Sequence, residues 1–184
     1  MKFIQTSLDG VYLIEPDCFG DYRGWFMESY SQKTFKEHGL DPVFIQDNHS
    51  YSREKHTLRG LHFQNEDTAQ AKLVRCIRGM VLDVAVNLIR SSGQYRQWFS
   101  TVLSAENKGQ LYIPKGFAHG YLTLCEDCEI QYKVDYPYAP EAERAIRYDD
   151  PEIGVDWGEN ISPILSGKDA TAPFLRDSDI SYEW

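Results

Sequence analysis

Short apolar or alternating runs, separated by turn signals, recur along this chain and constrain its fold more than any other feature. A half-buried strand alternates its side chains between two faces, and many such strands at close spacing are typical of an all-β sandwich or barrel. Pro114-Lys115-Gly116 is expected to reverse the chain, and Arg78-Gly79 is expected to form the turn of a hairpin joining two strands. The predicted strands are residues 11–14, 73–78, 81–88, 99–103, 110–113, 120–124 and 129–134.

Little helix is expected. Ser31 can cap a short helix over residues 32–38, which Gly39 would end. The proline-containing C-terminal part predicts loops and a short helix laid over the sheets. With 184 residues and no interdomain linker, the chain is predicted to be a single domain, residues 1–184, that buries one core.

The charge of the chain is acidic, with 28 Asp and Glu against 19 Lys and Arg and a net charge of −9. This balance argues against general binding to nucleic acid or to anionic membranes, which favours basic surfaces. An anionic small molecule would need a locally basic pocket. The chain has no long apolar run and no charged-then-apolar leader at Met1, so a soluble, cytoplasmic protein is expected.

The four cysteines do not form the spacing pattern of a disulfide framework. Cys125 and Cys128 form one C-x-x-C, with no second pair and no histidine close behind, whereas zinc would need further ligands. We expect reduced structural thiols and no metal site.

The period of two sorts two predicted strands into faces. In residues 81–88, Asp83 and Asn87 share a face with small residues, which indicates a face that lines a polar cavity. In residues 129–134, Tyr132 lies on the apolar face with Ile130 and Val134. A tyrosine in that position is more often a core residue with a satisfied hydroxyl than a catalyst.

Arg59, His62 and Lys72 place a guanidinium, an imidazole and an ammonium on neighbouring segments of predicted β-structure. A base beside two cations can remove a proton from carbon next to a carbonyl and stabilise the negative charge that results. A carboxylate would fix the histidine tautomer, and the spacing leaves both Asp83 and Asp169 open for this role.

Other chemistries find less support. A binding module would need the cations but not the histidine. A two-histidine metal site is disfavoured because no segment supplies two ligands on one face. The chain also lacks a G-x-S-x-G nucleophile motif and the glycine-rich loops that bind nucleotides.

A set of motifs follows in order from about residue 10 to residue 173. It comprises residues 21–28 (DYRGWFME), 46–50 (QDNHS), 59–64 (RGLHFQ), 72–75 (KLVR), 83–86 (DVAV), 113–120 (IPKGFAHG), 132–133 (YK) and 165–169 (LSGKD). Together these motifs closely resemble the dTDP-4-dehydrorhamnose 3,5-epimerase family. The resemblance implies a cupin-type jelly-roll β-sandwich or barrel with a few short helices, usually a homodimer, which works without a metal or an organic cofactor.

The resemblance also implies residue roles. His62 would be the base and Asp169 its partner, while Tyr132 would be the acid on the opposite face of the sugar. Lys72 would stabilise the enolate oxygen, with Asp83 placing that lysine. Residues 23–28 would serve the neighbouring subunit's site, because strands exchange between subunits in this family. The residues implied to bind the substrate are Arg23, Phe26, Glu28, Gln46, Asn48, Arg59, His119, Tyr138, Glu143 and Lys168.

The implied reaction inverts C3 and C5 of dTDP-4-dehydro-6-deoxy-D-glucose and gives dTDP-4-dehydro-L-rhamnose. A C3-only epimerase and an epimerase of another nucleoside diphosphate 4-keto sugar are the nearest alternatives. A non-catalytic cupin that binds sugar nucleotides is an alternative from a different class, and a metal-dependent cupin oxygenase comes after it.

Overall fold

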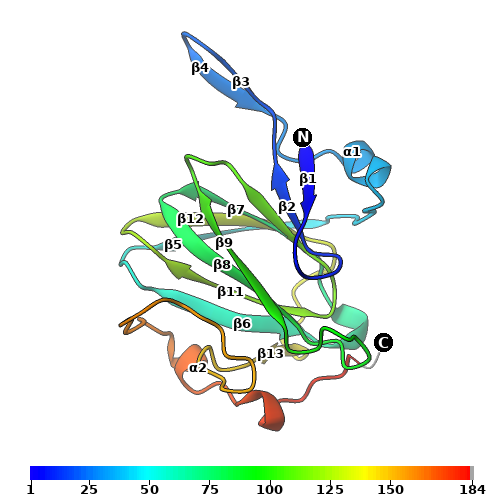
Figure 1. Ribbon diagram of the computed structural model, residues 1–184, viewed down its shortest axis with the longest axis vertical. Helices are drawn as coiled ribbons and strands as arrows, with labels where there is room; N and C mark the ends of the chain where they lie inside the picture. The colour runs from blue at the N-terminus through cyan, green and yellow to red at the C-terminus, as the bar shows by residue number, and fades with distance from the viewer. Residues whose placement is uncertain (183–184) are drawn as a thin grey trace.

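Two antiparallel β-sheets pack face to face in the structure, a computed structural model that describes residues 1–182 (Figure 1). A separate two-stranded ribbon, β3 (Cys18–Asp21) and β4 (Gly24–Met27), extends from one end of this sandwich. The six-stranded sheet contains, in spatial order, β1 (Lys2–Gln5), β2 (Tyr12–Glu15), β10 (Gln110–Ile113), β7 (Lys72–Arg78), β12 (Cys128–Val134) and β5 (Gln46–Ser52). The five-stranded sheet contains β13 (Glu143–Ala145), β6 (Leu58–Gln64), β11 (Phe117–Thr123), β8 (Met80–Asn87) and β9 (Trp98–Ser104). The predicted all-β, cupin-type sandwich with few helices is confirmed.

The alternation of side chains in β8 divides the core into layers. Val81 and Ala85 face the six-stranded sheet and pack with its inner side chains, whereas Val84 and Val86 pack on the outer side of their own sheet. Asp83 shares the inner face and is completely buried. The predicted polar position therefore lies between the two sheets.

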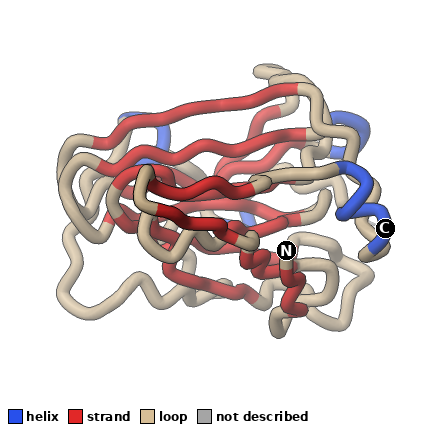
Figure 2. Tube along the Cα trace, turned by 90° about the horizontal axis from the view of Figure 1, so that it is seen from above, coloured by secondary structure: helices blue, strands red, loops and turns tan. Residues whose placement is uncertain are grey.

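Strands fill the middle of the molecule, and loops and short helices lie around them (Figure 2). The C-terminal part packs Trp157, Leu175 and Tyr182 onto the outer face of the five-stranded sheet. Helix α1 (Gln32–Glu37) buries Phe35 against the other sheet, and its N-cap is the predicted Ser31, whose hydroxyl accepts from the Thr34 N–H at 3.3 Å. The other helices are α2 (Gly167–Ala170) and the 3-10 turns η1 (Glu66–Thr68) and η2 (Leu175–Asp177). None of the helices in residues 1–182 is long and apolar enough to cross a membrane.

The predicted hairpin at Arg78-Gly79 is wrong. The chain bends at Gly79, whose φ of 76° favours glycine. However, β7 pairs with β10 and β12 in one sheet, while β8 pairs with β9 and β11 in the other. A turn signal specifies a reversal but not a pairing partner, and here the connection carries the chain from one layer to the other.

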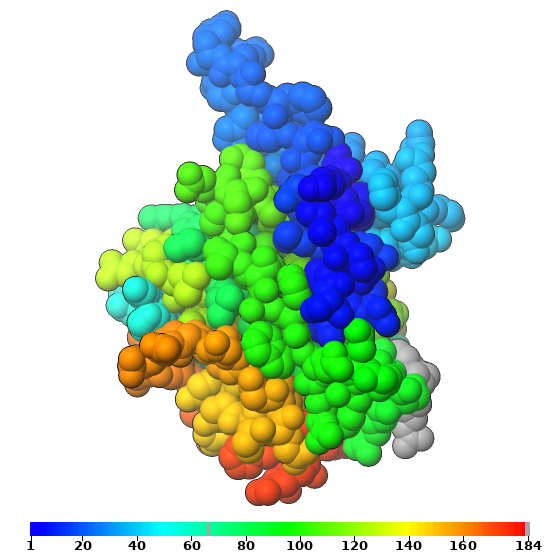
Figure 3. All heavy atoms as spheres, viewed as in Figure 1, coloured from blue at the N-terminus to red at the C-terminus, as the bar shows by residue number. Residues whose placement is uncertain are grey.

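The ribbon formed by β3 and β4 was not predicted and protrudes from the body of the molecule (Figure 3). It presents large aromatic side chains to solvent, among them Trp25 at 59% and Phe26 at 69% exposure. It has no apolar face that packs on the sandwich core, which is why its strands lack the alternation that identifies the others.

Candidate active site

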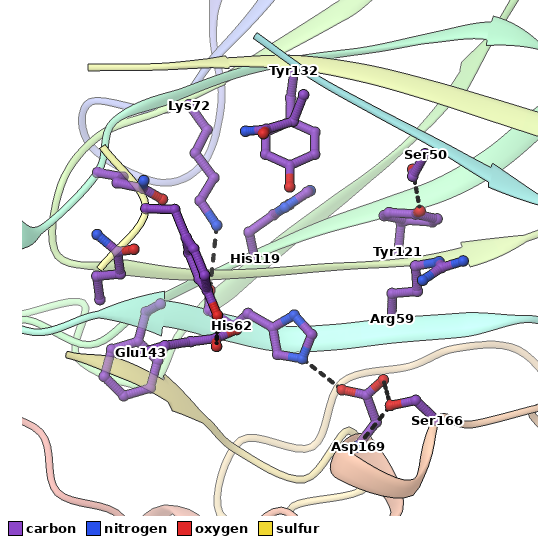
Figure 4. Close-up of a pocket in the computed structure, with 15 residues that line it drawn as sticks. Ser50, Arg59, His62, Lys72, His119, Tyr121, Tyr132, Glu143, Ser166 and Asp169 are labelled. Atoms are coloured by element: carbon purple, nitrogen blue, oxygen red, sulfur yellow. Dashed lines mark hydrogen bonds and ion pairs between the residues drawn. The ribbon is translucent and has the colours of Figure 1, made fainter. Parts of the chain in front are cut away.

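A cavity of about 360 Å³ lies between the two sheets, and side chains from both reach into it (Figure 4). From the five-stranded sheet come Arg59, His62, Phe63, Gln64, His119, Tyr121 and Glu143. The six-stranded sheet, the loops and helix α2 contribute Asn48, Ser50, Gln70, Lys72, Tyr132, Tyr138, Ser166 and Asp169.

His62 on β6 is paired with Asp169 of α2, and the imidazole Nε2 lies 2.5 Å from the carboxylate Oδ1. Asp169 is only 4% exposed. Its burial alone would raise its pKa, but hydrogen bonds from His62 and Ser166 outweigh burial and hold the pKa below its usual range. Of the two carboxylates that the sequence left open, the structure brings Asp169 to His62.

Asp83 on β8 is instead the partner of His119 on β11. The His119 Nε2 lies 3.0 and 3.1 Å from the two carboxylate oxygens of Asp83. His119 and His62 are register partners on paired strands, so the two histidines stand side by side in one sheet, each bonded to a different aspartate. No substrate is therefore needed to hold the orientation of either ring.

Lys72 enters the cavity from β7 of the opposite sheet, and its ammonium Nζ lies 3.5 Å from the His62 carbonyl oxygen. The side chain is buried, which lowers the pKa of Lys72 to about 8, and the charges of Asp83 and Glu143 oppose this decrease. Asp83 thus acts on Lys72 through its charge, while its hydrogen bonds go to His119. At neutral pH, Lys72 remains a cation with little water around it.

Tyr132 projects into the cavity from β12, on the side opposite His62 (Figure 4). Burial raises the pKa of its phenol, so the hydroxyl stays protonated at neutral pH. The residue also packs against the inner core with Ile130. Tyr132 therefore packs against the core, as expected, and also lines the cavity.

Glu143, on edge strand β13, also lines the cavity. Its carboxylate accepts a hydrogen bond from the Tyr138 hydroxyl at 2.6 Å and forms an ion pair with Lys168. Gln46 on β5 bonds both Asn48 and Tyr138. Its Nε2 donates to Asn48 at 2.9 Å, and its side-chain oxygen accepts from the Tyr138 N–H at 3.2 Å.

Arg59 is an exposed residue of β6, and its guanidinium donates to Ser52 Oγ at 3.3 Å and to the Tyr51 carbonyl at 3.1 Å. It lines the same cavity as His62. The predicted guanidinium and imidazole therefore line one cavity, and whether they act together stays a prediction.

Three predicted substrate-binding residues, Arg23, Phe26 and Glu28, lie on or just after the protruding ribbon and do not line this cavity. Arg23 is exposed and forms an ion pair with Asp21 at 2.5 Å. Within one chain, these residues and the histidine–aspartate pairs belong to different parts of the molecule.

The sequence reading missed some cavity residues, notably Ser50, Tyr121 and Ser166. Tyr121 lies two residues after His119 and therefore on the same strand face, and its hydroxyl lies 2.8 Å from Ser50 Oγ. Ser166 precedes Asp169 by three residues, the spacing of an N-cap, and both signals were available in the sequence.

In the described part of the chain, no group of three or more His, Cys, Asp or Glu side chains is placed to hold a metal ion. All four cysteines are free, and the Cys125 and Cys128 sulfurs are 3.4 Å apart.

Comparison with known proteins identifies the family. The model of the dTDP-4-dehydrorhamnose 3,5-epimerase family matches residues 5–177. The protein of that name from Salmonella typhimurium is 51% identical over 176 residues, which cover 95% of this chain and 96% of the relative.

Two solved structures agree with this match. The Bacillus anthracis epimerase with TDP and pyrophosphate bound superposes with a TM-score of 0.92 at 44% identity, covering 95% of this chain and 99% of that one. The Legionella pneumophila epimerase in complex with dTDP-4-keto-L-rhamnose has a TM-score of 0.92 at 43% identity, with 97% and 94% covered. The chain belongs to the dTDP-4-dehydrorhamnose 3,5-epimerase family.

Proposed function

We propose that this isomerase converts dTDP-4-dehydro-6-deoxy-D-glucose into dTDP-4-dehydro-L-rhamnose by inverting C3 and C5 in turn. The observation that carries the proposal is the facing arrangement of a histidine and a tyrosine from opposite sheets, with a buried ammonium between the walls of the same cavity. The names and bound ligands of the relatives agree with it.

His62 is the base in this mechanism. The contact with Asp169 favours the tautomer in which Nε2 carries the proton, which leaves the Nδ1 lone pair to take a proton from the substrate. The C4 ketone acidifies the hydrogens on both C3 and C5, so one base near the carbonyl can act on each centre. The ionised Asp169 then stabilises the imidazolium that forms.

Lys72 stabilises the enolate oxygen. General acid–base catalysis supplies roughly 10²–10⁴-fold, which is too little for deprotonation at carbon by itself. A well-placed donor to an oxyanion adds about 2.7–4 kcal/mol of transition-state stabilisation. A desolvated ammonium suits this role, because its field is weakly screened.

Tyr132 returns a proton to the opposite face of the ring. Its raised pKa keeps the phenol protonated, and its position across the cavity from His62 supports inversion rather than return of the proton to the same face. The nucleotide sugar would be bound by the cavity residues Asn48, Arg59, His119, Tyr138 and Glu143, together with Gln46 and Lys168, which bond Asn48 and Glu143.

The functional unit in this proposal is a cytoplasmic homodimer. Arg23, Phe26 and Glu28 would then complete the partner's cavity, since the ribbon that carries them extends away from the cavity of its own chain. The exposed aromatic side chains of this ribbon suit burial against a second subunit.

Deuterium exchange from solvent tests the reaction. With dTDP-4-dehydro-6-deoxy-D-glucose in D₂O, label should enter at C3 and C5, and His62→Asn should abolish both. His49→Asn is the matched control, because His49 is half-exposed and bonded to Glu129 outside the cavity. It should retain the exchange rate.

The other outcomes have distinct meanings. Label at C3 alone would identify a C3-only epimerase, and binding without label would identify a sugar-nucleotide-binding cupin. Parallel assays of the GDP- and CDP-linked 4-keto sugars would test the nucleotide, and the dTDP-linked sugar should have the highest kcat/KM.

A further inference from the structure

Both carboxylate oxygens of Asp169 are engaged by different side chains. Oδ1 lies 2.5 Å from His62 Nε2, and Oδ2 accepts the hydrogen bond of the Ser166 hydroxyl at 2.7 Å (Figure 4). A carboxylate can rotate about its Cβ–Cγ bond, and its terminal torsion is broad. A donor on Oδ2 therefore fixes the direction in which Oδ1 points.

Ser166 also holds the backbone of the residue that it orients. Its Oγ accepts a hydrogen bond from the Asp169 N–H at 3.1 Å, as the N-cap of α2. This helix has only four residues, which is too short to be stable by itself. One hydroxyl thus fixes both the main chain and the carboxylate of Asp169.

We propose that Ser166 is a positioning residue for the His62 base and acts through Asp169 rather than through the substrate. This inference rests on the proposed epimerase function and extends it by one residue. The hydroxyl keeps Asp169 Oδ1 aligned with Nε2, which keeps Nδ1 of His62 unprotonated and facing the cavity. It also stabilises the ionised carboxylate, in agreement with the lowered pKa of Asp169, where burial opposes the hydrogen bonds.

The first test separates rate from binding. Ser166→Ala should lower kcat about 10- to 100-fold, the range expected for a hydrogen bond to a charged group, while the Kd of dTDP changes less than about twofold. Ser166→Thr, which keeps the hydroxyl, should restore most of the rate. Thr171→Ala is the control in the same helix, because the Thr171 hydroxyl donates to the Gly167 carbonyl and does not contact Asp169. It should leave kcat unchanged.

The second test is a double-mutant cycle with Asp169→Ala, followed by deuterium wash-in over days so that slow enzymes remain measurable. The cap to the backbone N–H persists when Asp169 is replaced, but the bond to Oδ2 does not. Ser166→Ala should therefore slow exchange about 10-fold or more in the wild-type background and less than about twofold in the Asp169→Ala background. If Ser166→Ala does not fold, Ser166→Gly gives the same comparison, because glycine is tolerated at N-caps.

Equal effects in both backgrounds would overturn the inference, because Ser166 would then act only as a cap. A fall in dTDP affinity that accounts for the whole loss would also overturn it and make Ser166 a ligand contact. Absence of exchange in the wild-type enzyme would instead refute the proposed function, so the two failures are distinguishable.

Discussion

His62 and His119 are register partners on adjacent strands, yet each hydrogen-bonds a different buried aspartate. The aspartate that bonds His62 is Asp169 of helix α2. The aspartate that bonds His119 is Asp83 of β8, in the same sheet as the two histidines. Each ring thus has its own fixed tautomer. His62 and His119 can therefore be altered independently.

The first prediction concerns the pH dependence of the rate. In the proposed mechanism Lys72 must be charged to stabilise the enolate, and burial lowers its pKa to about 8. The kcat/KM should therefore fall as pH rises through about 8, because the ammonium loses its proton there. Lys72→Arg should lose this alkaline decrease, since a guanidinium remains charged. A wild-type profile that stays flat to pH 10 would assign another group to the oxyanion.

A second prediction concerns stability at the same residue. The pKa of Lys72 is lower in the folded protein than in the unfolded chain. Between about pH 8 and 10.5 the Lys72 amine is therefore protonated in the unfolded chain but largely neutral in the folded protein. Folding becomes more favourable as pH rises through that range. Below pH 8 the cost of the buried charge is fully present. Lys72→Met should therefore raise the free energy of unfolding at pH 7 by on the order of 2 kcal/mol and abolish most activity. Urea unfolding at pH 7 and pH 10 would measure it, and an equal change at both pH values would contradict it.

The third prediction separates proton removal from proton return. Tyr132→Phe should reduce epimerised product by roughly 100-fold, within the range for a general acid, while label exchange falls much less. NMR of the product in D₂O reports both quantities. Tyr112→Phe serves as the control, because Tyr112 is buried on β10 outside the cavity. Equal losses of exchange and product would mean that Tyr132 does not act at the second step.

The fourth prediction tests whether Arg23 serves the partner's site. Arg23→Ala and His62→Asn should each be inactive or nearly so. In mixed and reannealed dimers, one site would combine a native His62 with the partner's native Arg23. About one quarter of wild-type activity should then return in an equal mixture. No recovery, with mixed dimers verified by mass, would show that Arg23 serves its own chain.

The fifth prediction concerns the close approach of β6 and β11. A Cβ at Gly60 would lie 2.5 Å from the Gly120 Cα, and Gly60 has a φ of 128°. Gly60→Ala should therefore lower the free energy of unfolding by about 3 kcal/mol or more and displace His62. Gly93→Ala is the control, because a Cβ there meets nothing within 4 Å. Thermal unfolding of the two variants compares them, and similar Tm values would contradict the prediction.

The sequence correctly predicted those strands and helix ends that are specified by residues close together in the chain. Strand β10 has the predicted bounds, Gln110–Ile113, and Ser31 caps α1 as expected. Strand β11 begins at Phe117, three residues before its predicted start, because the segment after the Gly116 turn pairs at once with β8. Strand β5 was missed because its sequence, QDNHSYS, is polar, and only its pairing with β12 makes it a strand.

By itself, the sequence determined the all-β class, the inward position of Asp83, and the guanidinium, imidazole and ammonium groups that line one cavity. These follow from side-chain alternation and from chemistry that each residue carries with it. Tertiary structure alone decided which sheet each strand joins and that Asp83 bonds His119, whereas the pairing of His62 with Asp169 was implied only by the family resemblance. His62 and Asp169 are 107 positions apart, and His119 and Asp83 are 36 apart. Contacts over such separations depend on how the two sheets and the C-terminal segment pack, and no local pattern encodes that packing.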